Sequence, residues 1–284
     1  MNSFTGFYWL PKIWAVLWKV TVFTLLWGLM TTPFLIPFDA KLQELNKSHP
    51  LQTRVYYDLI SIVVLVAASW IMMRFVEHRP LIEIGLRAPR SISDFLIGII
   101  GGAIWLAVPL LTLWMFGWLS VQSALKISWV PLLWVSFAML LNVIVQEILG
   151  RGYIFLALES NLTTFWAILI SSIIFMLYHF AAFKGAWLPA LNVFAAGVLF
   201  AVAYKFSNNL WLPIGLHFAW NLLLGPVFGL AISGQNHWSA GWQIFRIQGP
   251  TLFTGGIFGI EGGLITLAAT IAGIIAIHSL SYRK

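Results

Sequence analysis

The chain has 284 residues, of which 60% are hydrophobic and only 9% are charged, and its mean hydropathy is +0.90. This composition excludes an ordinary soluble domain and indicates a membrane protein that crosses the bilayer several times. The formal net charge of +7 would suggest a nucleic-acid partner in a soluble chain, but here the basic residues lie between apolar segments. We therefore expect no nucleic-acid partner. Because the chain has no cysteine, disulfides, thiolate metal ligands and a cysteine nucleophile are excluded.

Apolar segments of about 20 residues, the length that crosses a bilayer core, recur about eight times. The sequence predicts a helix in each of them. In chain order they cover residues 13–38, 55–76, 95–118, 131–158, 163–183, 189–206, 210–232 and 256–279. The predicted fold class is therefore all-α, a polytopic bundle of about eight transmembrane helices. Because these helices leave no room for a soluble domain, residues 1–284 are expected to form a single integral-membrane domain.

The basic residues predict how the chain is oriented. The loop between the second and third predicted spans carries Arg74, Arg79, Arg87 and Arg90. Short loops rich in arginine and lysine usually face the cytoplasm. With eight spans, both termini are then expected on the cytoplasmic side too.

Few polar side chains interrupt the predicted spans. A charged group at the centre of a spanning helix costs about 2.5 to 3.5 kcal/mol, so each is a candidate for function. Asp58 and Glu159 lie near predicted helix ends and are expected to reach water. The remaining candidates are Gln146, Glu147 and Arg151 in the fourth span, His179 in the fifth, His217 and Asn221 in the seventh, and Glu261 in the eighth.

The spacing of these residues predicts which of them share a helix face. Glu147 and Arg151 are four residues apart, the separation at which opposite charges meet on a helix. The desolvation of such a pair is offset only with good geometry and further partners, which favours an interior cavity over lipid. His217 and Asn221 have the same separation and are expected to point the same way.

The turns between spans predict that these residues meet. A short turn at residues 159–164 joins the fourth and fifth spans, and it places His179 level with Gln146 and Glu147. The seventh span follows a turn at residues 207–209 on the same side, which brings His217 and Asn221 to a similar depth. We expect one water-filled chamber between the three spans.

This set of residues favours hydrolytic chemistry. A carboxylate beside an imidazole can take a proton from water, and a second imidazole with an amide can stabilise an oxyanion. Neither the HExxH zinc motif nor the GxSxG serine motif is present. A zinc site built from Glu147, His179 and His217 stays possible, since three such ligands and a water suit a catalytic metal. The preferred interpretation requires no cofactor.

Three motifs in this order carry a resemblance to a known family. They are "QEILGRG" at residues 146–152, Phe175 with His179, and His217 with Asn221. They resemble the EExxxR, FxxxH and HxxxN patterns of the CPBP family, the CAAX-processing and bacteriocin-processing intramembrane proteases, also called the Abi family. The resemblance covers about residues 130–225, which would be the catalytic core.

The resemblance implies an all-helical bacterial membrane protease that hydrolyses peptide bonds of membrane-associated or lipidated, CAAX-type peptides. Its expected partners are membrane lipids and a hydrophobic or lipidated peptide or protein substrate. The family uses its first glutamate and the histidine of the second motif to activate water, and the histidine and asparagine of the third motif to hold the oxyanion. By position these are Gln146 and His179, then His217 and Asn221.

The chain departs from the family at Gln146, where the pattern has glutamate. A glutamine amide accepts no proton at physiological pH. Three interpretations stay open. In the first, Glu147 is the base, although a helix turns it about 100° away from Gln146. In the second, the protein binds peptides without cleaving them, as an immunity or regulatory factor, and in the third, Glu261 completes the site. The preferred catalytic residues are Glu147, His179, His217 and Asn221, supported by Gln146, Arg151 and Glu261.

Overall fold

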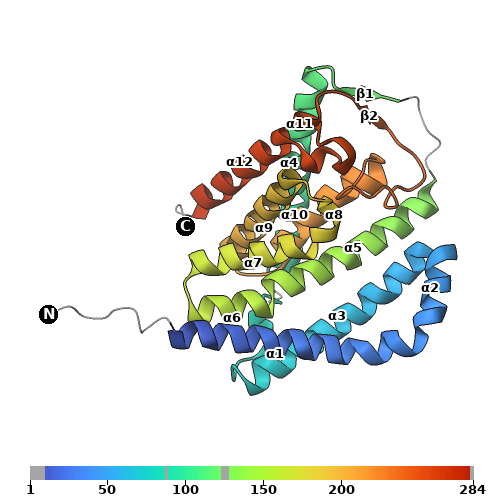
Figure 1. Ribbon diagram of the computed structural model, residues 1–284. Coiled ribbons are helices and arrows are strands. Elements are labelled where there is room, and N and C mark those ends of the chain that lie inside the picture. The colour runs from blue at the N-terminus through green and yellow to red at the C-terminus, as the bar shows by residue number, and fades with distance from the viewer. Residues whose placement is uncertain (1–9, 87–88, 123–127, 282–284) are drawn as a thin grey trace.

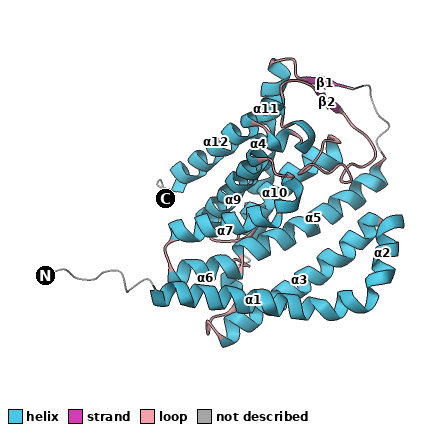
Figure 2. Cartoon of the chain, viewed as in Figure 1, coloured by secondary structure: helices cyan, strands magenta, loops and turns pink. Residues whose placement is uncertain are grey.

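The computed structural model describes residues 10–86, 89–122 and 128–281. Both chain termini and Arg87 of the arginine-rich loop lie outside the described residues. Helices make up nearly all of the regular structure (Figure 2), and the prediction of an all-α membrane bundle is confirmed.

Twelve α-helices follow one another in the described part of the chain. They are α1 (Leu10–Leu35), α2 (Asp39–Ser48), α3 (Pro50–Phe75), α4 (Ser91–Met115), α5 (Trp129–Arg151), α6 (Tyr153–Asn161), α7 (Thr164–Tyr178), α8 (Phe180–Phe183), α9 (Trp187–Ser207), α10 (Trp211–Leu222), α11 (Thr251–Thr254) and α12 (Leu264–Ser281). Two short strands, β1 (Leu119–Val121) and β2 (Phe245–Ile247), pair antiparallel. Single helical turns join several of these elements, among them η6 (Ile260–Gly262).

The number of long spans is smaller than the sequence suggests. Five segments of the described chain are long and apolar enough to cross a membrane: Leu10–Phe38, Pro50–Phe75, Ser91–Met115, Trp129–Asn161 and Trp187–Ser207. Two shorter apolar helices, Thr164–Tyr178 and Leu264–Leu280, accompany them.

The seventh and eighth predicted spans differ most from the structure. Helix α10 ends after 12 residues, about 18 Å of helix, because a π-turn containing Pro226 follows it. The chain then leaves the helix and forms the loop between α10 and β2. The last helix begins at Leu264, so Glu261 lies in the preceding turn, η6, and not inside a spanning helix.

The helices form layers (Figure 1). Helices α1, α2 and α3 lie on one side of α5 and α6, while α4, α7, α9, α10 and α12 lie on the other. The described chain begins at α1 and ends at α12 on the same side of the bundle, and β1 and β2 lie at the opposite side.

Helices α4 and α10 pack with their backbones in contact. Gly98 and Gly102 of α4 face α10, and a Cβ atom at either position would overlap backbone atoms of that helix. Gly215 of α10 likewise faces the backbone of α4 at Phe95 and Gly98. Small residues allow this close approach in lipid, where helices associate by packing and hydrogen bonds. The contact fixes the position of α10, the helix that carries His217.

Candidate active site

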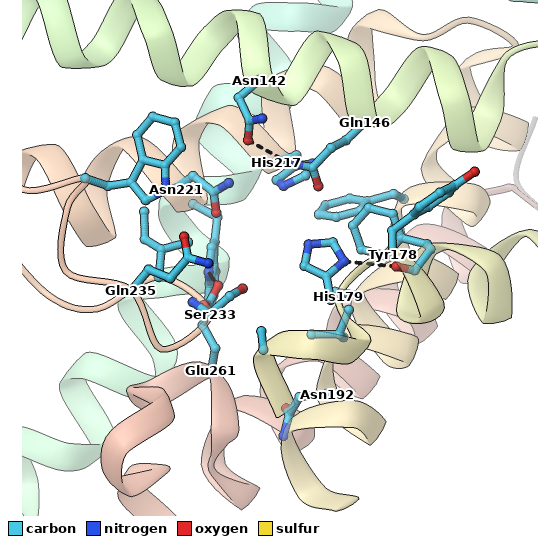
Figure 3. Close-up of a pocket in the computed structure, with 18 of the residues that line it drawn as sticks. Asn142, Gln146, Tyr178, His179, Asn192, His217, Asn221, Ser233, Gln235 and Glu261 are labelled. Atoms are coloured by element: carbon cyan, nitrogen blue, oxygen red, sulfur yellow. Dashed lines mark hydrogen bonds between the residues drawn. The ribbon is translucent and has the colours of Figure 1, made fainter. Parts of the chain in front are cut away.

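A cavity of about 360 Å³ lies among α3, α5, α7, α9, α10 and the loop after α10. The close-up in Figure 3 shows its polar side chains converging from different helices. Five of the seven residues predicted from the sequence line it: Gln146, His179, His217, Asn221 and Glu261. The other two, Glu147 and Arg151, do not line it.

His179 directly follows the last residue of α7, so its ring projects from the end of that helix. Its Nδ1 atom lies 2.9 Å from the carbonyl oxygen of Phe175. Because a carbonyl only accepts, Nδ1 carries the proton and Nε2 of the neutral ring keeps its lone pair. The rest of the ring faces the space bounded by Gln146, Asn221 and Ser233 (Figure 3). The site thus holds an imidazole oriented to accept a proton.

Gln146 faces the cavity from α5. Its Nε2 donates a hydrogen bond of 2.8 Å to Oδ1 of Asn142, one turn earlier on the same helix. Its Oε1 is buried and has no hydrogen-bond partner among the described residues. A buried acceptor without a partner is costly, and a water molecule in the cavity would satisfy it.

Glu147 lies behind His217, away from the cavity. Its Oε1 is 2.8 Å from Nδ1 of His217 and 3.3 Å from Nη1 of Arg151, and the side chains of Glu147 and Arg151 are both 0% exposed. Nη2 of Arg151 donates to the carbonyl of Gly197 at 2.9 Å. The ion pair predicted from the spacing of Glu147 and Arg151 is therefore present. Besides Arg151, the carboxylate of Glu147 contacts the imidazole of His217.

The geometry of α5 explains why Gln146 and Glu147 separate. Consecutive residues of an α-helix point about 100° apart, so only one of them faces the cavity. Gln146 lines the cavity and Glu147 does not. The carboxylate of Glu147 lies against Nδ1 of His217 and holds the ring proton on that nitrogen.

Two phenylalanines fix the imidazoles in place. The ring of Phe200 stacks on His217 with centroids 4.6 Å apart, and the ring of Phe175 lies 6.0 Å from His217 and 4.9 Å from His179. Asn221 lies one helical turn after His217, is buried, and lines the same cavity. The expectation that His217 and Asn221 share a face is met.

Glu261 closes the cavity on the side opposite Gln146 (Figure 3). Its Oε1 accepts a hydrogen bond of 2.8 Å from Nε1 of Trp220, and its Oε2 accepts one of 2.5 Å from the backbone N–H of Ser233. The carboxylate thus fastens the loop after α10 to the cavity wall. Both of its oxygens are occupied by protein donors.

The sequence interpretation missed a group on α3. Asp58, expected near water, is only 3% exposed, and its Oδ2 accepts a hydrogen bond of 2.9 Å from Nε of Arg54. Asn142 donates to Oδ1 of Asp58 at 3.4 Å, and Arg54 lines the cavity. Arg54 and Asp58 are four residues apart, the same signal that revealed Glu147 and Arg151.

The three residues that could form a zinc site are not arranged as a ligand set. Glu147 does not line the cavity, and its Oε1 is bonded to Nδ1 of His217 and Nη1 of Arg151, whereas Nε2 of His179 stays open. No group of three or more His, Cys, Asp or Glu side chains in the described ranges is placed to hold a metal ion.

The fold and the cavity define a class of protein: a polytopic membrane protein with a cavity between its helices into which several polar side chains project. Residues 128–223 match the family described as "Type II CAAX prenyl endopeptidase Rce1-like". This part of the chain runs from α5 to the end of α10 and contains all three motifs, and the match is consistent with the CPBP resemblance. No curated protein and no solved structure gave a significant match to the chain.

Proposed function

We propose that the protein is an intramembrane endopeptidase that hydrolyses peptide bonds of membrane-associated or lipidated, CAAX-type peptides, with His179 as the base that activates water. One observation carries the proposal. An imidazole with a free Nε2 and an unpartnered amide oxygen, from His179 and Gln146, line the same cavity as His217 and Asn221. The match to the CAAX prenyl endopeptidase family supports the substrate class.

In the proposed reaction a water molecule donates one hydrogen bond to Oε1 of Gln146 and another to Nε2 of His179. Its oxygen attacks the carbonyl carbon of the peptide bond as His179 takes its proton, and the carbonyl electrons move to the oxygen. The tetrahedral intermediate then breaks its C–N bond. The leaving nitrogen takes the proton back from His179, which leaves a carboxylic acid and an amine.

The oxyanion would be held by Asn221 and His217. The amide of Asn221 is a donor, and His217 can donate from Nε2 when its ring is protonated. Glu147 lies against Nδ1 of that ring and would be the counter-ion of the imidazolium. In this mechanism Glu147 acts through His217, and Arg151 keeps Glu147 in position. Glu261 keeps the loop after α10 closed over the cavity.

Cleavage of defined peptides tests the proposal. Purified protein in lipid nanodiscs is incubated with a farnesylated peptide ending in a free carboxylate, and the products are identified by mass spectrometry. Wild type should cleave it, and His179→Ala should be slower by at least about 100-fold, the lower range for loss of a general base. His78→Ala, in the loop after α3, is the matched control and should keep wild-type turnover. If wild type yields no product from a panel of such peptides, the peptidase proposal fails.

A second candidate is a protein that binds peptides without cleaving them, in an immunity or regulatory role. The observation that favours it is the lack of a carboxylate beside His179, since Glu147 faces away from the cavity and the oxygens of Glu261 are bonded to Trp220 and Ser233. Tight binding of the farnesylated peptide, unchanged in His179→Ala and without any product, would favour this function over hydrolysis.

A further inference from the structure

Asn192 and Glu261 lie on the side of the cavity away from Gln146 (Figure 3). They belong to a connected set of polar side chains, which we call the cavity floor. The set consists of Trp105 of α4, Asn192 of α9, Trp220 of α10, Glu261 of η6, and Thr266 and Thr270 of α12. Four of its six members lie outside residues 128–223, which match the endopeptidase family. In the proposed reaction none of them contacts the substrate.

Most N–H and O–H donors of the cavity floor are bonded within the protein. Nε1 of Trp105 donates a hydrogen bond of 3.2 Å to Oγ1 of Thr270, whose own hydroxyl donates to the carbonyl of Thr266 at 2.8 Å. The Thr266 hydroxyl donates to the carbonyl of Ile260 at 2.6 Å. The indole N–H of Trp220 is bonded to a carboxylate oxygen of the floor. These four side chains therefore have no polar hydrogen left for a ligand.

The amide of Asn192 has a fixed orientation. Asn192 is only 4% exposed, and its Nδ2 donates to the carbonyl of Leu188 at 3.1 Å and to that of Gly263 at 3.3 Å. A turned-over amide would place Oδ1 against these two carbonyl oxygens, so the two hydrogen bonds assign the oxygen. Oδ1 is buried and has no hydrogen-bond partner among the described residues. Asn192 thus holds an acceptor for which the protein supplies no donor.

Two residues lining the cavity share this property. Among the described residues that line it, Gln146 and Asn192 are the two with a buried side-chain atom that lacks a partner, and in both the atom is an amide oxygen. Figure 3 shows His179 between them. A buried acceptor without a partner is costly, so a ligand that brings donors is favoured. In the proposed reaction Gln146 receives the attacking water, and the oxygen of Asn192 is left.

A peptide backbone supplies the missing donor. A peptide that enters a cavity between membrane helices loses water from its N–H groups, and each of them then needs an acceptor. Val193 and Ala196, which line the cavity on the same helix as Asn192, have apolar side chains and offer none. An ionised carboxylate would bring only further acceptors. The cavity floor therefore suits an N–H group and not an anion.

The size of the cavity limits how far Asn192 lies from the reacting bond. A compact space of about 360 Å³ is about 9 Å across, and an extended peptide covers about 3.4 Å per residue. About three residues therefore reach from one end of the cavity to the other. A hydrogen bond so close to the reacting bond would set which peptide bond meets the water.

We propose that Oδ1 of Asn192 accepts a hydrogen bond from one backbone N–H of the peptide substrate, within about three residues of the scissile bond. The bonds from Nδ2 to Leu188 and Gly263 hold the amide in place, and the contact fixes the register of the peptide in the cavity. This inference rests on the proposed peptidase function, and it adds a residue that positions the substrate.

A series of farnesylated peptides tests it. In each peptide one backbone N–H, at one of the three positions on either side of the scissile bond, is replaced by an ester oxygen, which removes the donor and keeps the chain length. Mass spectrometry counts only cleavage at the original peptide bond. Wild type should lose about threefold to tenfold in kcat/KM for the ester at one position, the effect of one hydrogen bond. Asn192→Ala should lose less than about twofold for the same ester, because the acceptor is absent.

The matched control is Asn161→Ala in α6. Nδ2 of Asn161 also donates to the carbonyl four residues earlier, at 2.8 Å, but this residue does not line the cavity. The control should keep the sensitivity of wild type to the ester. If Asn192→Ala does not fold, Asn192→Ser, whose hydroxyl can keep the bond to Leu188, replaces it.

Three outcomes overturn the inference. In the first, no ester slows wild type at any position. In the second, a folded Asn192 variant keeps the sensitivity of wild type, which would mean that Oδ1 binds only a water molecule. In the third, the variant cleaves all the peptides equally more slowly with the ester pattern unchanged, which would make Asn192 a purely structural residue.

A binding measurement separates this inference from the peptidase function. If wild type cleaves none of the peptides, the peptidase function fails, and the affinities of the all-amide peptide and of each ester are measured in nanodiscs. The inference then predicts that one ester binds wild type about threefold to tenfold more weakly than the amide, and that Asn192→Ala binds the two alike. Equal affinities of wild type for all the peptides would overturn it.

Discussion

Gln146 and Glu147 are neighbours in the sequence, but helix α5 gives them different surroundings. Gln146 faces the cavity, where its amide can orient a water molecule, and Glu147 lies against Nδ1 of His217. Gln146 has no basic atom, and Glu147 does not line the cavity. In the proposed mechanism the proton therefore goes to His179.

Restoring a carboxylate at position 146 should speed the reaction. Gln146→Glu places a second proton acceptor beside His179, and we expect kcat to rise by about 10- to 100-fold, at the low end of what a general base contributes. Initial rates in nanodiscs measure this. Gln235→Glu, which adds the same charge elsewhere on the cavity wall, is the control and should not increase kcat. An unchanged rate for a well-folded Gln146→Glu protein would argue against water activation at this position.

Glu147 should affect the rate only through His217. Glu147→Gln removes the counter-ion of the imidazolium and leaves Arg151 buried without a charged partner, so we expect a lower kcat and a loss of stability of about 3 to 5 kcal/mol. The kinetic test is a double-mutant cycle with His217→Ala. On the His217→Ala background, Glu147→Gln should change kcat little, because the group it acts on is already absent. Additive losses would mean that Glu147 contributes independently of His217.

At the scale of elements, the position of α10 depends on its glycine contact with α4. Gly98, Gly102 and Gly215 allow the two backbones to touch, and this contact places His217 and Asn221 at the cavity. In lipid this packing replaces the hydrophobic driving force that holds helices together in water.

An added methyl group at this contact should separate the helices. In Gly215→Ala the Cβ atom would overlap the backbone of α4 at Phe95, and we expect a loss of stability of about 1 to 3 kcal/mol with reduced turnover. Thermal unfolding in detergent measures the first effect. Gly28→Ala in α1, where a Cβ atom meets nothing within 4 Å, is the control and should not destabilise. Equal melting temperatures for the two variants would contradict the role assigned to the contact.

The sequence predicts relations along a helix better than relations between helices. The i, i+4 spacing correctly predicted the Glu147–Arg151 pair and the common face of His217 and Asn221. Whether Gln146 or Glu147 faces the cavity depends on the rotation of α5 against its neighbours, which its own residues do not reveal. The length of α10 was missed because apolar residues that pack inside a protein look like those that face lipid.

At the scale of the whole molecule, the first and last described helices, α1 and α12, begin and end on one side of the bundle (Figure 1). This arrangement is compatible with both termini on one side of the membrane. The arginine-rich loop predicts that this side is the cytoplasm. Of its four arginines, Arg74, Arg79 and Arg90 lie in the described residues.

The absence of cysteine makes the orientation directly testable. Single variants His78→Cys, in the arginine-rich loop, and Ser120→Cys, in β1, each introduce one thiol. On intact cells a membrane-impermeant thiol reagent should label the cysteine at position 120 and leave the one at position 78 unlabelled until the cells are opened. The reverse pattern would invert the orientation.

The claim on which the mechanism depends is that His179 removes a proton from water inside the cavity. Chemical rescue of His179→Ala tests it most directly, because free imidazole is small enough for a cavity of about 360 Å³. We expect the variant to lose at least about 100-fold in kcat and imidazole to restore part of that loss, with more basic imidazoles restoring more. A His179→Ala protein that cleaves as fast as wild type, or a folded but slow variant that no imidazole rescues, would contradict the claim.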